Sequence, residues 1–198
     1  MNAYYRMETI HGYPLDEAIS ALQKSVRRGL RDEACSWAIE LNESGLGAYC
    51  WRRLLVISTE DIGMANPALA GLVYQLYAAS DVLMKNARTR ATGPEKEKVR
   101  WNEEHLTMAV WLLAESEKSR ELCDMYATIT LRMKNGAEHL EIADDYLDQH
   151  TARGRAMGRG IDHFNAEGDK LHPHRIIDGD RWGAAWEAER PHDGDRTD

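Results

Sequence analysis

The helical periodicity of residues 46–67 constrains the fold more than any other feature of this chain. The stretch reads LGAYCWRRLLVISTEDIGMANP, and its apolar side chains recur at Ala48, Trp51, Leu55 and Ile62. Spacings of this kind place the side chains on one face of an α-helix. A helix with one apolar stripe buries that stripe against other elements. We therefore expect a long central helix that ends where a glycine follows Ile62.

The polar side of this predicted helix carries charged residues in a fixed order. Two arginines precede two acidic residues, a glycine that can end the helix, and an Asn-Pro pair that can begin the next one. In chain order these residues are Arg52, Arg53, Glu60, Asp61, Gly63, Asn66 and Pro67. A helix that serves only for packing needs no such order around one glycine, so we expect this segment to bear on function.

The rest of the chain continues in the same pattern of helices joined by short loops. Six further stretches combine helical spacing of apolar residues with start and stop signals; they are 14–28, 32–42, 67–84, 102–115, 116–135 and 138–150. The sequence therefore predicts an all-α chain of about seven helices.

The composition changes near Thr151, from alternating apolar and polar residues to a segment rich in glycine and charge. We expect an irregular tail there, with residues 188–198 disordered. The predicted organisation is an N-terminal extension at 1–13, a helical domain at 14–150, and an irregular, partly disordered tail at 151–198.

The charge balance argues against a chain that binds nucleic acid over its whole surface. The formal net charge is −8 and the sequence pI is about 5.5, although a local basic patch could still bind. No run approaches the about 18 apolar residues that indicate a membrane span, and the first residues lack the apolar stretch of a signal peptide. The three cysteines fit buried residues of a reducing compartment. We therefore expect a cytoplasmic protein with no membrane association.

Residues 85–101, KNARTRATGPEKEKVRW, interrupt the helical pattern with positive charge. We expect a basic loop, or a loop with a short helix after Pro94, and this is the best nucleic-acid candidate in the chain. A merely solvated loop is the alternative. Its basic residues are Lys85, Arg88, Arg90, Lys96, Lys98 and Arg100.

The end of the first predicted helix is a second basic region. Lys24, Arg27 and Arg28 lie within two turns of one another. Cations near a helix C-terminus are favoured by the helix dipole in any case. Contact with DNA or with another subunit and a purely local role both remain open for these residues.

The adjacent carboxylates Glu60 and Asp61 allow two interpretations. They could serve acid-base catalysis or bind Mg²⁺, but neighbouring residues point about 100° apart on a helix, and no third carboxylate shares their face. We favour a structural role, in which they pair with Arg52, Arg53 or a neighbouring helix end. The two arginines themselves could contact DNA phosphate, cross a subunit interface or pair within the chain.

The tail offers weak metal-ligand candidates. His163, His172 and His174 lie in the run DHFNAEGDKLHPH, beside several acidic residues. Such a set would suit zinc in a metal-dependent hydrolase or nuclease, but neither an HExxH motif nor a CxxC pair accompanies it. Solvated histidines are the simpler interpretation, and we expect no bound metal.

Four tryptophans, Trp37, Trp51, Trp101 and Trp111, lie at or beside core spacing. We expect them to pack in the core rather than to stack on nucleic-acid bases.

Three segments resemble the C-terminal domain of the RarA/MgsA family, AAA+ ATPases that are related to clamp loaders and known in eukaryotes as the Werner-interacting ATPases. The segments are ISALQKSVRRGLRDEACSWAIEL (19–41), YCWRRLLVISTEDIGMANPAL (49–69) and, more weakly, MAVWLLAESEKS (108–119). Residues that match the family pattern are Ser20, Ala21, Lys24, Ser25, Arg27, Arg52, Arg53, Leu54, Glu60, Asp61, Ile62, Gly63, Asn66, Pro67, Leu113, Ala114, Lys118 and Ser119. The resemblance covers about residues 14–130.

The chain also departs from the family. The segment 85–101 is longer than the family's connection, of which Gly93, Pro94 and Glu95 resemble a remnant. The tail has neither the Gly-Tyr-Gly nor the Tyr-Pro-His-Asp motif with which the family usually ends.

The resemblance implies a clamp-loader-collar-like helical domain through which subunits associate into tetramers, and which has no chemistry of its own. The 198 residues hold no G-x-x-x-x-G-K-[ST] loop and no Walker-B-like run. We therefore expect a non-catalytic protein without a cofactor, acting in DNA replication, recombination or repair. It would form a homotetramer, or join a separately encoded AAA+ ATPase or other replication proteins. Lys118 joins the basic residues and the Arg-Arg and Glu-Asp pairs as an interface or DNA-contact candidate.

Overall fold

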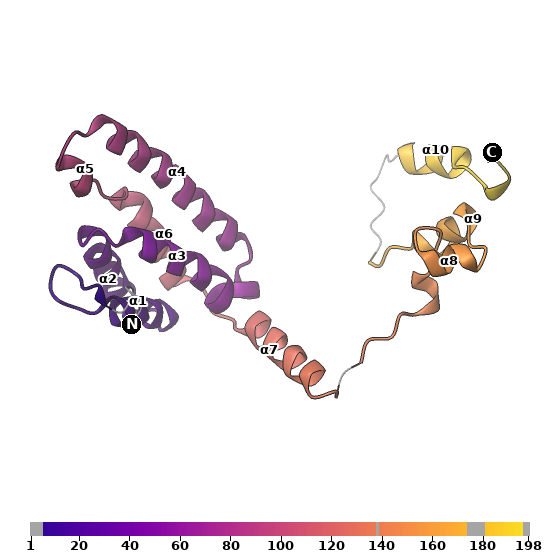
Figure 1. Cartoon of the computed structure of the whole chain (residues 1–198), viewed down its shortest axis with the longest axis horizontal. Helices are drawn as coiled ribbons and strands as arrows, with labels where there is room; N and C mark the ends of the chain where they lie inside the picture. The colour runs from indigo at the N-terminus through magenta and orange to yellow at the C-terminus, as the bar shows by residue number, and fades with distance from the viewer. Residues whose placement is uncertain (1–5, 138, 174–180, 196–198) are drawn as a thin grey trace. The chain divides into compact units, whose positions relative to one another are not determined.

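The computed structural model describes residues 6–137, 139–173 and 181–195, and the regular structure in these ranges is helical (Figure 1). Apart from one isolated bridge between Glu8 and Pro14, the described residues contain no strand. The prediction of an all-α chain is confirmed. The chain divides into two compact units, Met1–Asn135 and Gly136–Asp198, and each is described by itself.

The described part of the first unit has seven α-helices. They are α1 (Leu15–Arg27), α2 (Arg31–Glu43), α3 (Gly47–Ile57), α4 (Ala68–Arg90), α5 (Glu95–Lys98), α6 (Glu103–Glu115) and α7 (Glu121–Lys134). Between α3 and α4 lie a π-helical turn, η2 (Ser58–Ile62), and a 3₁₀ turn, η3 (Gly63–Ala65). The predicted central helix is therefore present as α3 and η2, and it ends at the predicted glycine.

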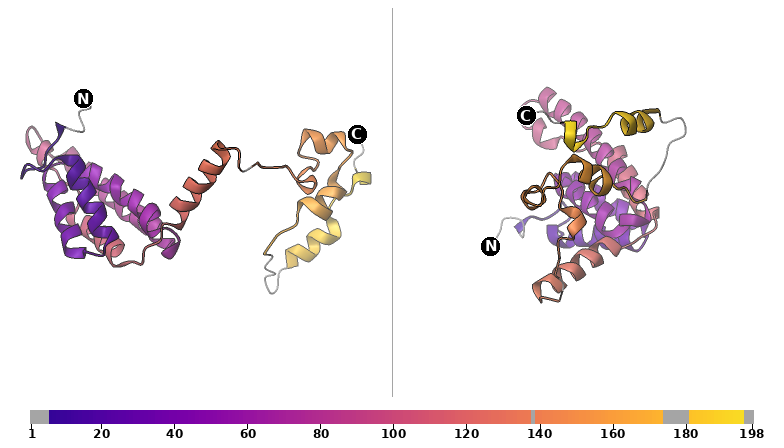
Figure 2. Two further views of the ribbon diagram at one scale, coloured as in Figure 1. Left: turned by 90° about the horizontal axis from the view of Figure 1, so that it is seen from below. Right: turned by 90° about the vertical axis from the view of Figure 1, so that its right-hand side faces the viewer.

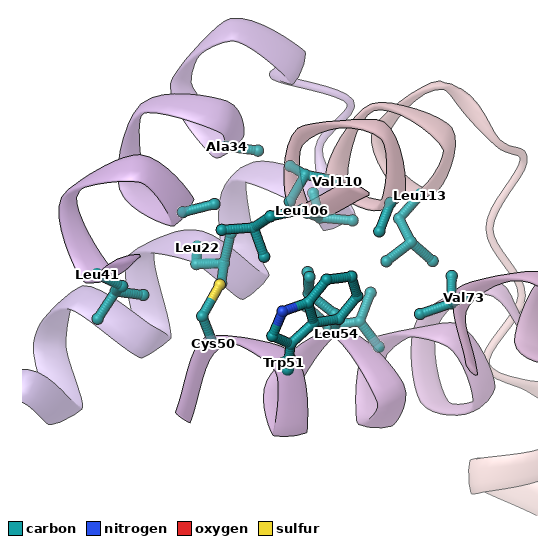
Figure 3. Close-up of a cluster of buried hydrophobic side chains, with 14 of the residues drawn as sticks. Leu22, Ala34, Leu41, Cys50, Trp51, Leu54, Val73, Leu106, Val110 and Leu113 are labelled. Carbon is teal, nitrogen blue, oxygen red and sulfur yellow. The ribbon is translucent and has the colours of Figure 1, made fainter. Parts of the chain in front are cut away.

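The core forms where α1, α2, α4 and α6 pack around α3, with the side chains pointing toward one another (Figure 3). Trp51 on α3 is fully buried, and its ring lies against Tyr77 and Trp101 at centroid distances of 5.7 and 6.1 Å. Burial of one such large apolar side chain stabilises the fold by roughly 1.5–3 kcal/mol. Around Trp51 the fully buried residues include Leu15, Leu22, Val26, Leu41, Leu54, Ile57, Ile62, Val73, Val110 and Leu113.

The loop before α6 is fixed by close packing at Gly47. A Cβ at this position would lie 2.5 Å from Cδ1 of Trp101, so no larger residue fits without a shift. The buried Asn42 side chain donates to the carbonyl of Trp101 at 3.0 Å and accepts from its amide at 3.2 Å. These contacts satisfy the backbone of a buried loop residue that has no helical partner.

Trp111 differs from the prediction that it packs in the core. Its side chain is 49% exposed, and the guanidinium of Arg31 lies 4.1 Å from its ring centroid. Trp51 and Trp101 are buried as predicted, and Trp37 is partly buried against the core.

Helix α4 and the helix predicted over 138–150 both differ from the prediction. Helix α4 does not end near Met84 but continues to Arg90, because the exposed basic residues that follow extend the helix. The helix predicted over 138–150 is absent from residues 139–150, where the only regular element is the 3₁₀ turn η4 (Asp144–Tyr146); residue 138 lies outside the described ranges. In this stretch Leu140 is 79% exposed, whereas Leu147 is buried.

Helix α7 leaves the bundle as a separate rod in two views of the structure (Figure 2). It contacts η2 and η3 near its start, and none of its residues is buried. The predicted start of this helix at residue 116 is wrong, because α7 begins five residues later at Glu121, whose amide donates a hydrogen bond to the hydroxyl of Ser119.

The second unit contains η4 and, where the sequence predicts an irregular tail from residue 151, further short helices. These are α8 (Ala152–Ala156), α9 (Ile161–His163), the π-helical turn η5 (Phe164–Gly168), α10 (Arg181–Glu189) and η6 (Asp193–Asp195). The unit begins at Gly136, before the predicted boundary at Thr151. Residues 196–198 of the segment predicted to be disordered lie outside the described ranges. None of the helices in the described ranges combines the length and apolar composition that a membrane crossing needs.

Candidate functional site

The turn between α3 and α4 carries the candidate site. Beyond Ile57 the helix widens into the π-turn η2, a feature that often accompanies functional sites. The chain then reverses at Gly63, whose φ is 49°. A Cβ at Gly63 would lie 3.1 Å from the carbonyl oxygen of Ser119. Glycine therefore meets both needs of the turn, the left-handed backbone and the close approach of the chain that precedes α7.

Asp61, in this turn, is a fully buried carboxylate. One carboxylate oxygen accepts a hydrogen bond from Nε of Arg27 at 2.6 Å, and the other accepts from the side-chain amide of Gln23 at 2.8 Å. Its backbone carbonyl accepts from the amide of Ser119 at 2.8 Å. A buried charge is tolerated only when it is paired and hydrogen-bonded. Arg27 and Gln23 meet that need at the carboxylate. Asp61 thus ties α1, η2 and the start of the α7 segment together.

Glu60 occupies the outer side of the same cluster. Its carboxylate lies 3.5 Å from Arg27 and 3.9 Å from Arg120. Because all three side chains are about a third exposed or more, solvent screens these pairs and each adds little to stability. Glu60 and Asp61 therefore face arginines, which leaves no open carboxylate pair for a metal or for acid-base chemistry at this turn.

The expectation that the acidic pair takes a partner at a neighbouring helix end agrees with the structure, since Arg27 is the last residue of α1. Neither of the other two expected partners pairs with it directly. Arg53 donates to the side-chain oxygen of Gln23 at 3.0 Å and so reaches Asp61 through the amide. Arg52 is exposed, and its guanidinium lies 5.6 Å from the ring of Tyr49.

We name the connected side chains the Asp61 cluster: Gln23, Arg27, Arg53, Glu60, Asp61 and Arg120. Gln23 and Arg120 were not among the site residues predicted from the sequence. Gln23 could have been suspected, because it precedes Arg27 by one helical turn beside the apolar face of α1. Nothing in the sequence signals Arg120, which is brought to the cluster by the turn at residues 116–120.

The outer face of α3 forms a shallow pocket beside this cluster. It has a volume of about 310 Å³ and is lined by Ile19, Tyr49, Arg52, Arg53 and Val56. The pocket combines two guanidinium groups with apolar and aromatic side chains, the residue types that are enriched where proteins contact one another.

Lys118 lies between α6 and α7 and is held by backbone oxygens. Its ammonium donates to the carbonyls of Ala114, at 3.0 Å, and Ser116. Burial lowers the pKa of Lys118, while the negative charges of Asp61 and Glu115 oppose that shift. A cation at this place satisfies the free carbonyls at the end of α6. Its geometry is that of a helix cap rather than of a group that contacts DNA.

The other two basic candidates of α1 lie apart from the cluster. Lys24 donates to the hydroxyl of Ser20 at 2.7 Å, and with Arg28 it borders an open pocket of about 500 Å³. Asp16, Glu17 and Glu33 line the same pocket. The mixed charge makes this surface a poor site for phosphate.

The predicted basic loop is not one loop. Lys85, Arg88 and Arg90 are exposed on the last two turns of α4, and the short helix α5 forms after Pro94, as one of the two alternatives predicted. Lys85 pairs with Asp81 at 2.6 Å.

The basic residues of α5 and after are also partly engaged. Lys98 pairs with Glu95 at 2.7 Å, and Arg100 donates to the carbonyls of Glu43 and Glu97 at 3.0 and 2.6 Å. The remaining cations of the segment, Arg88, Arg90 and Lys96, make no ion pair with any described residue.

The histidine candidates do not assemble into a metal site within the described ranges, where no three His, Cys, Asp or Glu side chains converge. His163 is partly buried and His172 is exposed, and His174 lies outside the described residues. Other histidines of this unit pair with single carboxylates, His150 with Asp148 at 3.1 Å and His192 with Asp162 at 2.7 Å.

Fold and site together define a helical bundle whose charged residues join helix ends around a buried carboxylate. No protein-family model matches the chain, and neither does any curated protein sequence.

Proposed function

We propose that this chain is a non-catalytic helical assembly domain, similar to the C-terminal domain of the RarA/MgsA AAA+ ATPases, that acts in DNA replication and recombination in the cytoplasm. The observation that carries the proposal is the convergence of the three resembling segments at one place. Segment 19–41 supplies Arg27, segment 49–69 supplies Arg53 and Asp61, and segment 108–119 ends at Ser119 beside them.

This convergence supports a resemblance of fold over a chance likeness of three helices. Residues that match the family pattern hold one buried junction, with Arg27 on Asp61 at 2.6 Å and the amide of Ser119 on the carbonyl of Asp61 at 2.8 Å. Gly63, another of the matching residues, permits the approach of the segment that contains Ser119. The matching charges are therefore used inside the domain, where they position helices relative to one another.

Association with other subunits is supported by what the bundle leaves exposed. Several large apolar side chains lie on the outer faces of α3, α4 and α6. Single exposed apolar residues are common, but patches of them mark surfaces that bind other proteins. Those at least 40% exposed are Val56, Leu72, Tyr74, Val82, Leu83, Met108 and Trp111.

The mass in solution tests the proposal. Light scattering of the full chain at moderate salt should give a tetramer of about 90 kDa, four times the chain mass of 22.5 kDa. A monomer at every concentration and salt would contradict the proposal.

A matched pair of variants locates the assembly surface. Arg52 is exposed in the pocket on α3, so Arg52→Glu should lower the mass or weaken the assembly. Arg88→Glu makes the same change of charge on the far end of α4 and should leave the mass unchanged. Equal effects of the two variants would argue against the α3 pocket as an interface.

In the second form of the proposal, the domain joins a separately encoded AAA+ ATPase or another replication protein. Affinity purification from the native host, followed by mass spectrometry, should then recover an AAA+ protein that is lost with Arg52→Glu and kept with Arg88→Glu. Recovery of no such protein would count against this form.

DNA binding is a second candidate function, and the exposed cations Arg88, Arg90 and Lys96 favour it. If they contact phosphates, DNA affinity should fall steeply with salt, and their joint replacement by alanine should make the salt slope less steep by about three. An unchanged salt slope would exclude these three residues as a DNA-binding surface.

A further inference from the structure

Helix α7 lacks the packing that stabilises most helices in proteins. It runs for 14 residues with none of them buried. An isolated helix of this length is marginal in water, and helical stability in proteins comes mainly from burial of an apolar face. Thr128, Ile129 and Thr130 are β-branched residues of only moderate helix propensity. A stable α7 therefore needs a surface to cover its apolar face.

That apolar face is continuous and narrow. At 100° per residue, five large apolar side chains fall within an arc of about 100°. These side chains, which we name the α7 seam, are Leu122, Met125, Tyr126, Ile129 and Met133. Their exposed fractions run from 38% for Leu122 and Ile129 to 74% for Tyr126. The seam has the width and the spacing of one that pairs with another helix.

The charges beside the seam indicate which helix it fits. One flank of α7 carries Glu121 in the first turn and Arg132 in the last turn, with Met125 and Ile129 between them along the same open surface. If a second α7 lies antiparallel, Glu121 of each copy faces Arg132 of the other, so both ends of the pair carry opposite charges. In a parallel two-fold pair this flank would instead face the other flank of the partner helix, so Glu121 and Arg132 would not meet each other across the interface.

We propose that α7 is a self-association helix that pairs antiparallel with α7 of a second copy of this chain. The inference rests on the proposed assembly function and names the surface through which two copies meet. The pair has two-fold symmetry, so every contact occurs twice and the interface closes on itself. Leu122 of one copy packs near Met133 of the other, and Tyr126 near Ile129, with the two helix axes about 8–10 Å apart.

The size of the interface sets the expected strength. A helix of 14 residues is about 21 Å long, so a single helix pair buries less than the about 1,600 Å² of a standard interface. The pair should therefore dissociate on dilution when no other surface adds to it.

A seam variant and an outer-face variant form the first test. Ile129→Lys places a charge in the seam, whereas Leu131→Lys places the same charge on the opposite face, where Leu131 is 60% exposed. Sedimentation velocity of the full chain should show that Ile129→Lys halves the assembled mass and that Leu131→Lys leaves it unchanged. Because neither residue is buried, both variants should keep the far-ultraviolet circular dichroism of the bundle.

A charge exchange forms the second test and reports the orientation. Glu121→Lys and Arg132→Glu should each weaken the pair, since each sets like charges together at both ends. The double variant should restore the wild-type mass, and so should an equimolar mixture of the two single variants, because each copy then meets opposite charges. In a parallel pair, neither single variant would weaken association relative to the wild type.

The outcomes separate this inference from the proposed function. An assembled wild type whose mass Ile129→Lys does not change overturns the α7 pairing and leaves the assembly function standing. A wild type that is monomeric at all concentrations overturns both. Loss of mass with Leu131→Lys as well, or no rescue by the double variant, also overturns the antiparallel pairing.

Discussion

Helices α3 and α7 share an amphipathic pattern but have opposite surroundings. Both are amphipathic and of similar length, 11 and 14 residues. The apolar face of α3 is buried against its neighbouring helices around Trp51, whereas no residue of α7 is buried. An apolar stripe therefore shows that a helix needs a partner, but it does not show whether the partner lies in the same chain.

The charged residues of the two regions also differ in burial. Asp61 at the end of α3 is fully buried and takes its partners from α1 of the same chain. The charges of α7, Glu121 and Arg132, lie on an open flank. A buried ion pair fixes how helices meet within a domain, whereas exposed charges can choose between partners and orientations.

The largest expected effect comes from a matched pair of tryptophans in the bundle. Trp51→Ala should lower the free energy of unfolding by about 4 kcal/mol, because it removes a fully buried indole and leaves a cavity. Trp111→Ala should cost below about 1 kcal/mol, because Trp111 is half exposed and loses mainly its contact with Arg31. Urea denaturation measures both free energies of unfolding, and equal losses would contradict the assignment of Trp51 to the core and Trp111 to the surface.

The next effect concerns the ion pair of the Asp61 cluster. Arg27→Met should cost about 2–3 kcal/mol, because it leaves the carboxylate of Asp61 buried without a cation; partial exposure of Arg27 reduces the cost. Asp61→Asn should cost less, about 1–2 kcal/mol, since Arg27 can still reach water and Glu60.

Arg28→Met is the control, because Arg28 is the exposed neighbour of Arg27 and should change stability by less than about 0.5 kcal/mol. Thermal unfolding of the three variants ranks their losses of stability. A larger loss for Asp61→Asn than for Arg27→Met would contradict a buried carboxylate that depends on Arg27.

A smaller effect is expected where the bundle meets the segment before α7. Gly63→Ala forces a left-handed φ on alanine and crowds the carbonyl of Ser119 at 3.1 Å, so it should cost about 2 kcal/mol. Gly93→Ala meets the same backbone strain, with φ of 54°, but has nothing within 4 Å, and should cost about 1 kcal/mol. Chemical denaturation measures the difference, and no difference would mean that the approach of Ser119 is easily relaxed.

The smallest effect on stability is expected for Ile129→Ala in α7. This variant should cost less than about 0.5 kcal/mol at concentrations low enough for single chains, because its partner is then absent. The matched variant in α3, Ile57→Ala, should cost about 3 kcal/mol, because Ile57 is fully buried. A cost of Ile129→Ala that is large and independent of concentration would mean that α7 packs within its own chain.

Much of the bundle could be predicted from the sequence, because local signals and burial agree there. The spacing around Trp51 gives the central helix, and Gly63 ends it with the positive φ that glycine permits. The extension of α4 to Arg90 could not be predicted, since exposed basic residues satisfy a helix and a loop equally well.

The candidate site could be predicted only in part. Its acidic members were identified, and Arg27 was named as a basic residue at a helix end, but the pairing of Arg27 with Asp61 depends on how α1 crosses α3. The π-turn η2 has no sequence signature that distinguishes it from an α-helical end. Gln23 was missed because a glutamine beside an apolar face is usually solvated. Helical periodicity also predicted a helix over 138–150 that residues 139–150 do not form, where Leu140 and Ile142 stay exposed although Leu147 is buried.

Hydrogen exchange of α7 as a function of protein concentration tests the central distinction most directly. Amides of α3 should be strongly protected at every concentration, because their packing lies within one chain. Amides of α7 should exchange rapidly at the lowest concentration and become protected as the concentration rises, because a second copy covers the helix. Protection of α7 that does not change with concentration would contradict a helix that depends on another chain.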